Sequence, residues 1–207
     1  MKIAEHIWLL EASRAAGKTP GFHCYLIEEE DGSVTMVDTS LPGRGEAILS
    51  ELREMGLEPA NLKRILLTHT DMDHIGNAKA LQEATGCAVY VSAVEKEYLT
   101  GERERLPMKQ KMFEGFEAPE TEIYPDRLGE YQIVSTPGHT AGHVCILYRA
   151  CCFAGDCCST ESGEVTPPGE EFTEDMEMAV QSLHKIDRYS FGIWCPAHGL
   201  PKRHREP

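Results

Sequence analysis

An apolar run that ends in four potential metal ligands constrains this chain more than any other feature. In RILLTHTDMDHIGN, residues 64–77, the run leads directly into His69, Asp71, Asp73 and His74. On a strand, positions 69, 71 and 73 share one face and 74 points away. On a helix, at about 100° per residue, the four side chains spread around the cylinder. They converge if a strand ends near His69 and an irregular loop wraps an ion, so the stretch predicts a metal site.

The length and composition describe one ordinary globular domain over residues 1–207. The chain has 207 residues, of which 41% are hydrophobic and 26% are charged. Its net charge of -14 argues against nucleic acid or an anionic membrane surface as a partner. We expect no signal peptide and no membrane span, because no stretch approaches roughly 20 apolar residues. A cytoplasmic location follows as an expectation, with the eight cysteines as reduced, buried thiols.

The apolar pattern predicts two rounds of strands and helices. The first round has a hairpin over 22–38, helices over 43–56, 75–85 and 93–99, and strands before His69 and over 87–92. The second has three strands over 130–156, a helix capped by Thr173, and a last strand over 191–199. This order suits an α+β fold in which two sheets pack face to face with helices outside.

Residues 101–120 interrupt this rhythm. The segment mixes charges, Pro107, Pro119 and bulky apolar side chains. It is either a cap inserted over a site or a packed surface excursion, and its composition favours neither.

Three further candidate ligands follow apolar or turn-forming runs and lie beside glycines. They are His139 in STPGHTAGH, Asp156 in FAGDCC and His198 in CPAHG. Loops of this kind often carry function. With the four residues of the opening stretch they make seven nitrogen and oxygen donors. Seven donors are too many for one tetrahedral zinc, but they suit two metal ions that share a carboxylate.

These pieces resemble the metallo-β-lactamase-fold hydrolases. LLTHTDMDHIGN is similar to the family's T-H-x-H-x-D-H-x-G motif, and TPGHTAGH, FAGD and PAHG follow in the family's order. Asp38 in MVDTS matches the acidic residue that the family carries at the end of an early strand. The resemblance spans about residues 20–200 and implies a four-layer αββα sandwich with the site at one edge.

The resemblance also implies how the ligands divide between two divalent metal ions. Asp38 and His143 are expected to support the ligands by hydrogen bonds rather than to touch metal. The expected ligands are His69, Asp71 and His139 for the first metal, Asp73, His74 and His198 for the second, and Asp156 as the bridge between them.

Asp71 departs from the family pattern, which has a histidine there. With two divalent ions, three aspartates and a bridging hydroxide, the ligand sphere is formally neutral. We therefore expect a bound water with a higher pKa than in the histidine version. The harder oxygen ligand makes iron or manganese acceptable beside zinc, which we expect first. Alternatively, Asp71 does not bind and the first site is weak or empty.

Such a centre predicts a hydrolase in which metal-bound water attacks the substrate and Asp73 orients that water. The expected substrate is a small cytoplasmic metabolite with an ester-like bond, either a thioester or a lactone. An alternative is a di-iron redox protein related to the flavodiiron proteins, which also have a carboxylate at the second motif position and would need a separate electron donor. A homodimer is compatible with either prediction, and nothing in the sequence decides the oligomeric state.

Overall fold

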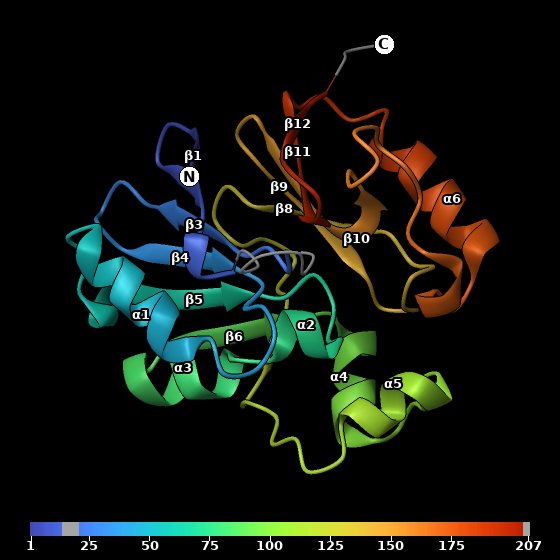
Figure 1. The fold of residues 1–207 in the computed structure, drawn as a ribbon, viewed down its shortest axis with the longest axis horizontal. Coiled ribbons are helices and arrows are strands. Elements are labelled where there is room, and N and C mark those ends of the chain that lie inside the picture. Colours follow the sequence, from blue (N-terminus) through green and yellow to red (C-terminus); the bar gives the residue numbers. More distant parts are fainter. Residues whose placement is uncertain (14–20, 205–207) are drawn as a thin grey trace.

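Two β-sheets packed face to face make the centre of the computed structural model, which describes residues 1–13 and 21–204. Helices cover the outer faces of both sheets (Figure 1). This arrangement confirms the predicted α+β fold with four layers in the order αββα.

The first sheet has seven strands in sequence order. Strands β1 to β4 are antiparallel, and β4 to β7 are parallel because the chain crosses over between them. Helix α1, Gly45–Glu54, and helix α3, Ala78–Thr85, make two of these crossovers. The strands are Lys2–Ala4 (β1), Ile7–Leu9 (β2), Tyr25–Glu28 (β3), Val34–Val37 (β4), Leu62–Leu66 (β5), Ala88–Val91 (β6) and Glu122–Ile123 (β7).

The second sheet has five strands in the order β12-β11-β10-β9-β8. Only β10 and β11 are parallel among its described pairs, and helix α6, Met176–Ile186, makes the connection between them. The strands are Gln132–Ser135 (β8), Val144–Tyr148 (β9), Cys151–Ser159 (β10), Ile193–His198 (β11) and Lys202–Arg203 (β12).

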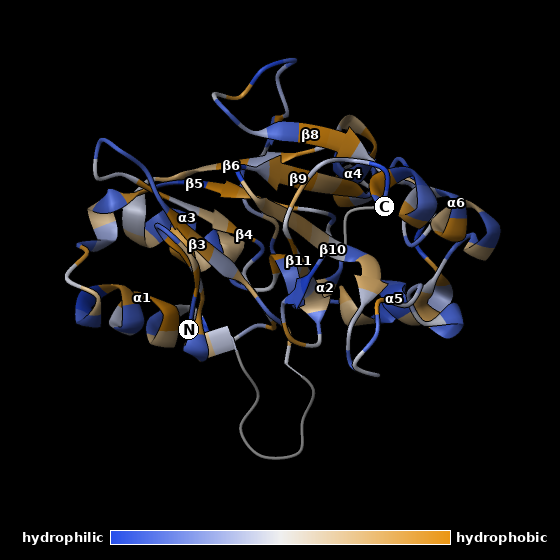
Figure 2. Cartoon of the chain, turned by 90° about the horizontal axis from the view of Figure 1, so that it is seen from above, coloured by the Kyte–Doolittle hydropathy of each residue, from blue (hydrophilic) through white to orange (hydrophobic). Residues whose placement is uncertain are grey.

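Three hydrophobic cores separate the four layers, and strand periodicity assigns residues to them. In β3, Tyr25 and Ile27 belong to the core between the sheets, whereas Leu26 belongs to the core under α1 and α3. The third core joins the second sheet to α6, with Leu183 and Trp194 among its members. Figure 2 shows hydrophobic residues along the strands, while the helices mix hydrophobic and hydrophilic residues, as expected of elements with one buried face.

Short helices gather at one edge of the sandwich. They are α2 (Met72–Ile75), α4 (Ala93–Thr100) and α5 (Pro107–Met112), and they lie together near the end of β5 in Figure 1. Three single turns of 3-10 helix occur elsewhere in the described chain, at Glu11–Ser13, Pro59–Asn61 and Glu170–Phe172. No helix within residues 1–13 and 21–204 has the length and apolarity needed to cross a membrane.

Two sequence predictions of helix boundaries are wrong. Helix α6 is capped by Asp175, whose side chain accepts a hydrogen bond from the Met178 amide at 2.9 Å. Thr173 instead donates its hydroxyl to the Gly169 carbonyl at 2.7 Å. The helix predicted over 75–85 is split into α2 and α3, because Asn77 turns to bind the loop after β4, where its amide donates to the Thr39 carbonyl at 2.5 Å.

Candidate metal centre

All seven predicted ligands lie together at one edge of the sandwich, where they come from the segment after β5, the loop between β8 and β9, the interior of β10 and the end of β11. They make two groups, and within each group the ligand atoms lie within 4.8 Å of one another. We call these groups the first subsite and the second subsite. The first subsite is His69, Asp71 and His139, and the second is Asp73, His74, Asp156 and His198.

A single helical turn, rather than a wholly irregular loop, brings the first four ligands together. Asp71 is the N-cap of α2, and its carbonyl accepts hydrogen bonds from the amides of His74 at 2.9 Å and Ile75 at 3.0 Å. This turn folds the chain back, so that the rings of His69 and His74 lie with their centroids 3.9 Å apart. The prediction of an irregular loop is therefore wrong from residue 72 onward.

The first subsite has the spacing of a metal ligand set. Asp71 Oδ2 lies 3.1 Å from His139 Nε2 and 3.5 Å from His69 Nε2. Ligand atoms placed tetrahedrally at the usual zinc distances are about 3.4 Å apart. The three side chains are almost completely buried.

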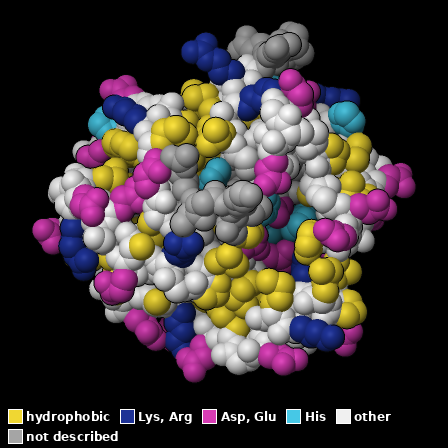
Figure 3. Space-filling view, in the orientation of Figure 1, with side chains coloured by type: hydrophobic (Ala, Val, Ile, Leu, Met, Phe, Trp, Pro, Cys, Tyr) yellow, Lys and Arg dark blue, Asp and Glu magenta, His cyan; other side chains and the backbone are white. Residues whose placement is uncertain are grey.

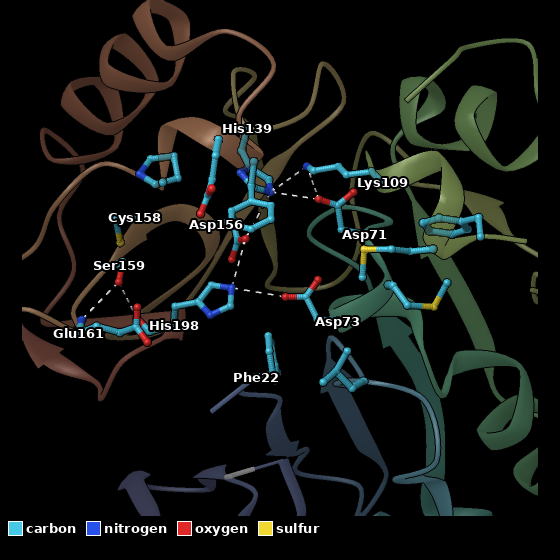
Figure 4. Close-up of a pocket in the computed structure, with 18 residues that line it drawn as sticks. Phe22, Asp71, Asp73, Lys109, His139, Asp156, Cys158, Ser159, Glu161 and His198 are labelled. Carbon is cyan, nitrogen blue, oxygen red and sulfur yellow. Dashed lines mark hydrogen bonds and ion pairs between the residues drawn. The ribbon is translucent and has the colours of Figure 1, made fainter. Parts of the chain in front are cut away.

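The second subsite is similarly spaced and is joined to the first by Asp156. His198 Nε2 lies 3.4 Å from Asp73 Oδ2 and 3.3 Å from Asp156 Oδ2. His74 Nε2 lies 3.4 Å from Asp156 Oδ1. Asp156 Oδ2 is also 3.3 Å from His139 Nε2, so this carboxylate reaches both subsites (Figure 4). The geometry is that expected of a bridging ligand.

Buried atoms without hydrogen-bond partners show that these residues fit cations. Within the part of the chain that the structure describes, His69 Nε2, His74 Nε2 and Asp156 Oδ1 are buried and make no hydrogen bond. Leaving such polar atoms unpaired is costly, and a cation would satisfy all three. Imidazole and carboxylate donors suit zinc, iron and manganese. The assignment of individual ligands stays a prediction.

The two subsites differ in electrostatic character. In the second subsite, the charge of Asp156 is the main cause that raises the pKa of His198 to about 10. Burial by itself lowers the pKa of His74, but the carboxylates of Asp156, Asp73 and Asp38 outweigh it and hold that pKa well above its usual value. In the first subsite, burial is the main cause that holds the pKa of His69 well below its usual value. The second subsite therefore concentrates negative charge that a cation would neutralise.

Asp38 connects the strand β4 to the loop of candidate ligands by hydrogen bonds. Its carboxylate accepts hydrogen bonds from the Thr68 amide and the Thr68 hydroxyl, both at 2.8 Å, and lies 2.9 Å from His74 Nδ1. Pairing Nδ1 with a carboxylate leaves Nε2 of His74 available to a metal. Asp38 adopts a left-handed backbone with φ of 57°, which is uncommon for a residue other than glycine. Such strain is typical of residues held by a functional site.

His143 supports Asp156 from behind. Its Nε2 accepts a hydrogen bond from the Asp156 amide at 3.1 Å, and its Nδ1 lies 2.8 Å from the Thr136 hydroxyl. Burial lowers the pKa of His143 to about 4, so the ring is neutral and can accept that bond. Gly155 allows this close packing, because a Cβ atom there would lie 2.4 Å from Thr68 Oγ1.

Glu95 on α4 is a structural residue that the sequence analysis missed. Its carboxylate accepts hydrogen bonds from the Thr70 amide at 2.8 Å, the Thr70 hydroxyl at 2.5 Å and the Thr140 hydroxyl at 2.5 Å. Thr70 lies between two predicted ligands and Thr140 follows a third, so Glu95 connects the two ligand loops. It is completely buried, and a glutamate in a short polar helix shows no sequence signal of such a role.

Arg105 and Lys109 were also missed, and both reach the first subsite. Arg105 Nη1 lies 3.3 Å from Asp71 Oδ1, and Arg105 Nη2 donates to the Thr70 hydroxyl at 2.7 Å. The Lys109 ammonium contacts Asp71 Oδ2 and lies 3.3 Å from His139 Nε2. Both side chains come from the segment 101–120. The charge count made from the ligands alone was therefore incomplete, because two cations partner Asp71.

The two subsites border a cavity of about 520 Å³. Figure 3 shows His and acidic side chains in a hollow that hydrophobic side chains border. Asp71, Asp73, His139, Asp156 and His198 all line the cavity. The rest of the wall is mostly apolar, with contributions from Phe22, Leu41, Met72, Met112, Phe113 and Phe172, and it also includes Lys109, Ser159, Glu161 and Glu171.

A two-sheet αββα sandwich with histidines and aspartates gathered at one edge defines a metal-binding hydrolase fold. Residues 23–198 match the family described as the metallo-beta-lactamase superfamily. The chain belongs to that superfamily, as the resemblance in its motifs indicated. It is 26% identical over 208 residues to the probable metallo-hydrolase YflN of Bacillus subtilis (strain 168). This match covers 84% of this chain and 78% of that relative.

Two further comparisons bear on the fold and the chemistry. The chain is 29% identical over 171 residues to the hydroxyacylglutathione hydrolase of Klebsiella pneumoniae, and this match covers 80% of this chain and 56% of that relative. The crystal structure of TTHA1623 in a di-iron-bound form has a TM-score of 0.67 and 24% identity, and it covers 88% of this chain and 90% of that one. The structural likeness shows the shared fold.

Proposed function

We propose that this chain is a metal-dependent hydrolase that cleaves the ester-like bond of a small metabolite, with a thioester or a lactone as the substrate class. The observation that carries the proposal is the gathering of seven candidate nitrogen and oxygen ligands, five of which line a cavity whose wall is mostly apolar. A reacting carbonyl fits beside the candidate ligands, and an acyl chain fits the apolar part of the wall.

Two divalent ions, when bound, would lower the pKa of a water molecule and polarise the substrate carbonyl. The chain supplies the rest. Asp73 lines the cavity and its side chain is 18% exposed, so it can accept a hydrogen bond from the attacking water and orient it. Asp38 and His143 hold His74 and Asp156 in place. The apolar wall excludes other water from the reacting atoms.

The comparisons support hydrolysis in general rather than a particular substrate. One relative is named a probable metallo-hydrolase and another is named for the hydrolysis of a hydroxyacylglutathione. They do not favour the alternative of a di-iron redox protein. We further propose zinc as the first choice of metal with iron or manganese as alternatives, a cytoplasmic location, and a single domain in which residues 101–120 cap the cavity.

The test is the Asp73→Ala variant with metal content measured in the same sample. We expect turnover of a panel of thioesters and lactones to fall roughly 10²–10⁴-fold, in the range typical of a lost acid-base or orienting group. The matched control is Asp126→Ala, because Asp126 is an exposed aspartate outside the cavity. Metal retained together with unchanged turnover would refute the role of Asp73. Failure of the whole panel with metal bound would refute the substrate class.

A further inference from the structure

Lys109 occupies an unusual position for a lysine, because it lies beside predicted metal ligands with its side chain almost completely buried. Only 6% of that side chain is exposed. Its ammonium contacts Asp71 Oδ2 and lies 3.3 Å from His139 Nε2. These are two of the three ligand atoms of the first subsite, and Figure 4 shows both contacts.

Arg105 occupies the other side of the same carboxylate. Its Nη1 lies 3.3 Å from Asp71 Oδ1, so each oxygen of Asp71 faces a cationic side chain. Arg105 is held there by the ring of Phe113, whose centroid lies 4.0 Å from the guanidinium carbon. Burial keeps these charges from being screened by solvent. A metal ion in the first subsite must therefore share Asp71 with two positive charges that repel it.

The second subsite lacks this competition. Across residues 1–13 and 21–204, the ion pairs of Asp73 and Asp156 are with histidines, and neither carboxylate pairs with a lysine or an arginine. Its two aspartates therefore face imidazoles, which can themselves bind a cation, rather than the fixed charges of a lysine or an arginine. The first subsite nevertheless remains able to take a metal, because His69 Nε2 is buried and makes no hydrogen bond to Lys109 or to any other described residue.

We propose that the two subsites fill unequally. A divalent ion binds the second subsite tightly, and the first subsite fills only at a higher metal concentration, because Lys109 and Arg105 already neutralise Asp71. Lys109 and Arg105 are then positioning residues that set the affinity of the first subsite through Asp71. The inference rests on the metal centre of the proposed function, but not on the substrate.

The experiment titrates Zn²⁺ into the full chain after its metal has been removed with a chelator. Calorimetry measures the binding events, and metal analysis after gel filtration counts the bound ions. We expect two binding events, with the second at least about tenfold weaker than the first. The His69→Ala variant assigns them, because it should abolish the weak event and leave the tight one. In Lys109→Met the weak event should tighten roughly 10- to 100-fold, the range in which groups that contact ligands tune metal affinity.

Two controls separate charge from folding. Lys109→Arg keeps the positive charge and should retain the weak event. Lys111→Met removes an exposed lysine from the same helix and should bind both ions as the unaltered chain does. Two events of equal affinity in the unaltered chain would overturn the inference, as would loss of the tight event in His69→Ala or an unchanged weak event in folded Lys109→Met. Absence of all Zn²⁺ binding would instead overturn the metal centre of the proposed function.

Discussion

Replacing Glu95 with alanine tests whether one buried carboxylate connects the two ligand loops. Glu95→Ala removes three accepted hydrogen bonds, two from Thr70 and one from Thr140. A hydrogen bond to a charged group contributes about 1.5–3 kcal/mol, and the Thr70 amide would be left buried without its acceptor. The cost of burying Glu95 offsets part of this sum, so we expect a loss of about 4 kcal/mol in the free energy of unfolding.

Glu95→Gln should lose only about 1–2 kcal/mol. Its amide oxygen can still accept from Thr70, and its amide nitrogen can donate to the Thr140 hydroxyl. Glu97→Ala is the matched control on the same helix, because the Glu97 side chain is 38% exposed and its ion pair with Arg103 is a surface pair. Such pairs contribute about 0–1 kcal/mol.

Urea unfolding followed by circular dichroism, in chelator so that metal does not contribute, measures all three variants. If the free energies of unfolding of Glu95→Ala and Glu97→Ala lie within about 1 kcal/mol of each other, the connecting role of Glu95 is refuted.

The pH dependence of the free energy of unfolding is a second test of the role of Glu95. Burial is the main cause that raises the pKa of Glu95, so the folded state holds this proton more tightly than the unfolded chain. The stability that depends on Glu95 is therefore fully present below its unfolded pKa and falls as pH rises through its folded pKa. The unaltered chain should lose stability relative to Glu95→Gln over that window.

Three further predictions concern the residues around the ligands. Asp38→Asn should weaken metal binding at the second subsite roughly 10- to 100-fold, because His74 loses its carboxylate partner. Competition with a chromophoric chelator measures the affinity, and an unchanged affinity would contradict the prediction. Gly155→Ala should lower the free energy of unfolding in urea by about 2–4 kcal/mol, because Gly155 has φ of +47° and the new Cβ would meet the Thr68 side chain. A loss below about 1 kcal/mol would show that the loop relaxes. Removing metal should lower the melting temperature by roughly 5–10 °C relative to protein in Zn²⁺ at 100 times the dissociation constant of the tighter subsite, because binding contributes about 2.7 kcal/mol at that concentration. Equal melting temperatures would argue against a bound ion.

The gathering of the seven candidate ligands and the packing of two sheets between helices could be predicted from local patterns and motifs. Short apolar runs between turn signals predicted strands such as β3 and β9, and an apolar run that ends before His69 predicted the loop of candidate ligands. Asp38 could be assigned a supporting role because it too follows a strand in a matching motif. The N-cap of α6 and the division of α2 from α3 could not be predicted, since Asn77 lies between these two helices and contacts a loop more than thirty residues away in sequence.

The sequence by itself determined which donors this chain offers, because short motifs mark all seven candidate ligands, four of them within residues 69–74 and three later in the chain. Only the tertiary structure decided what surrounds them. Glu95, Arg105 and Lys109 belong to no motif, and their charges act on Asp71 and Thr70 because α4 and the segment 101–120 fold against the end of β5. Electrostatic interactions depend on separation in space and on burial, and neither can be read from distance along a chain.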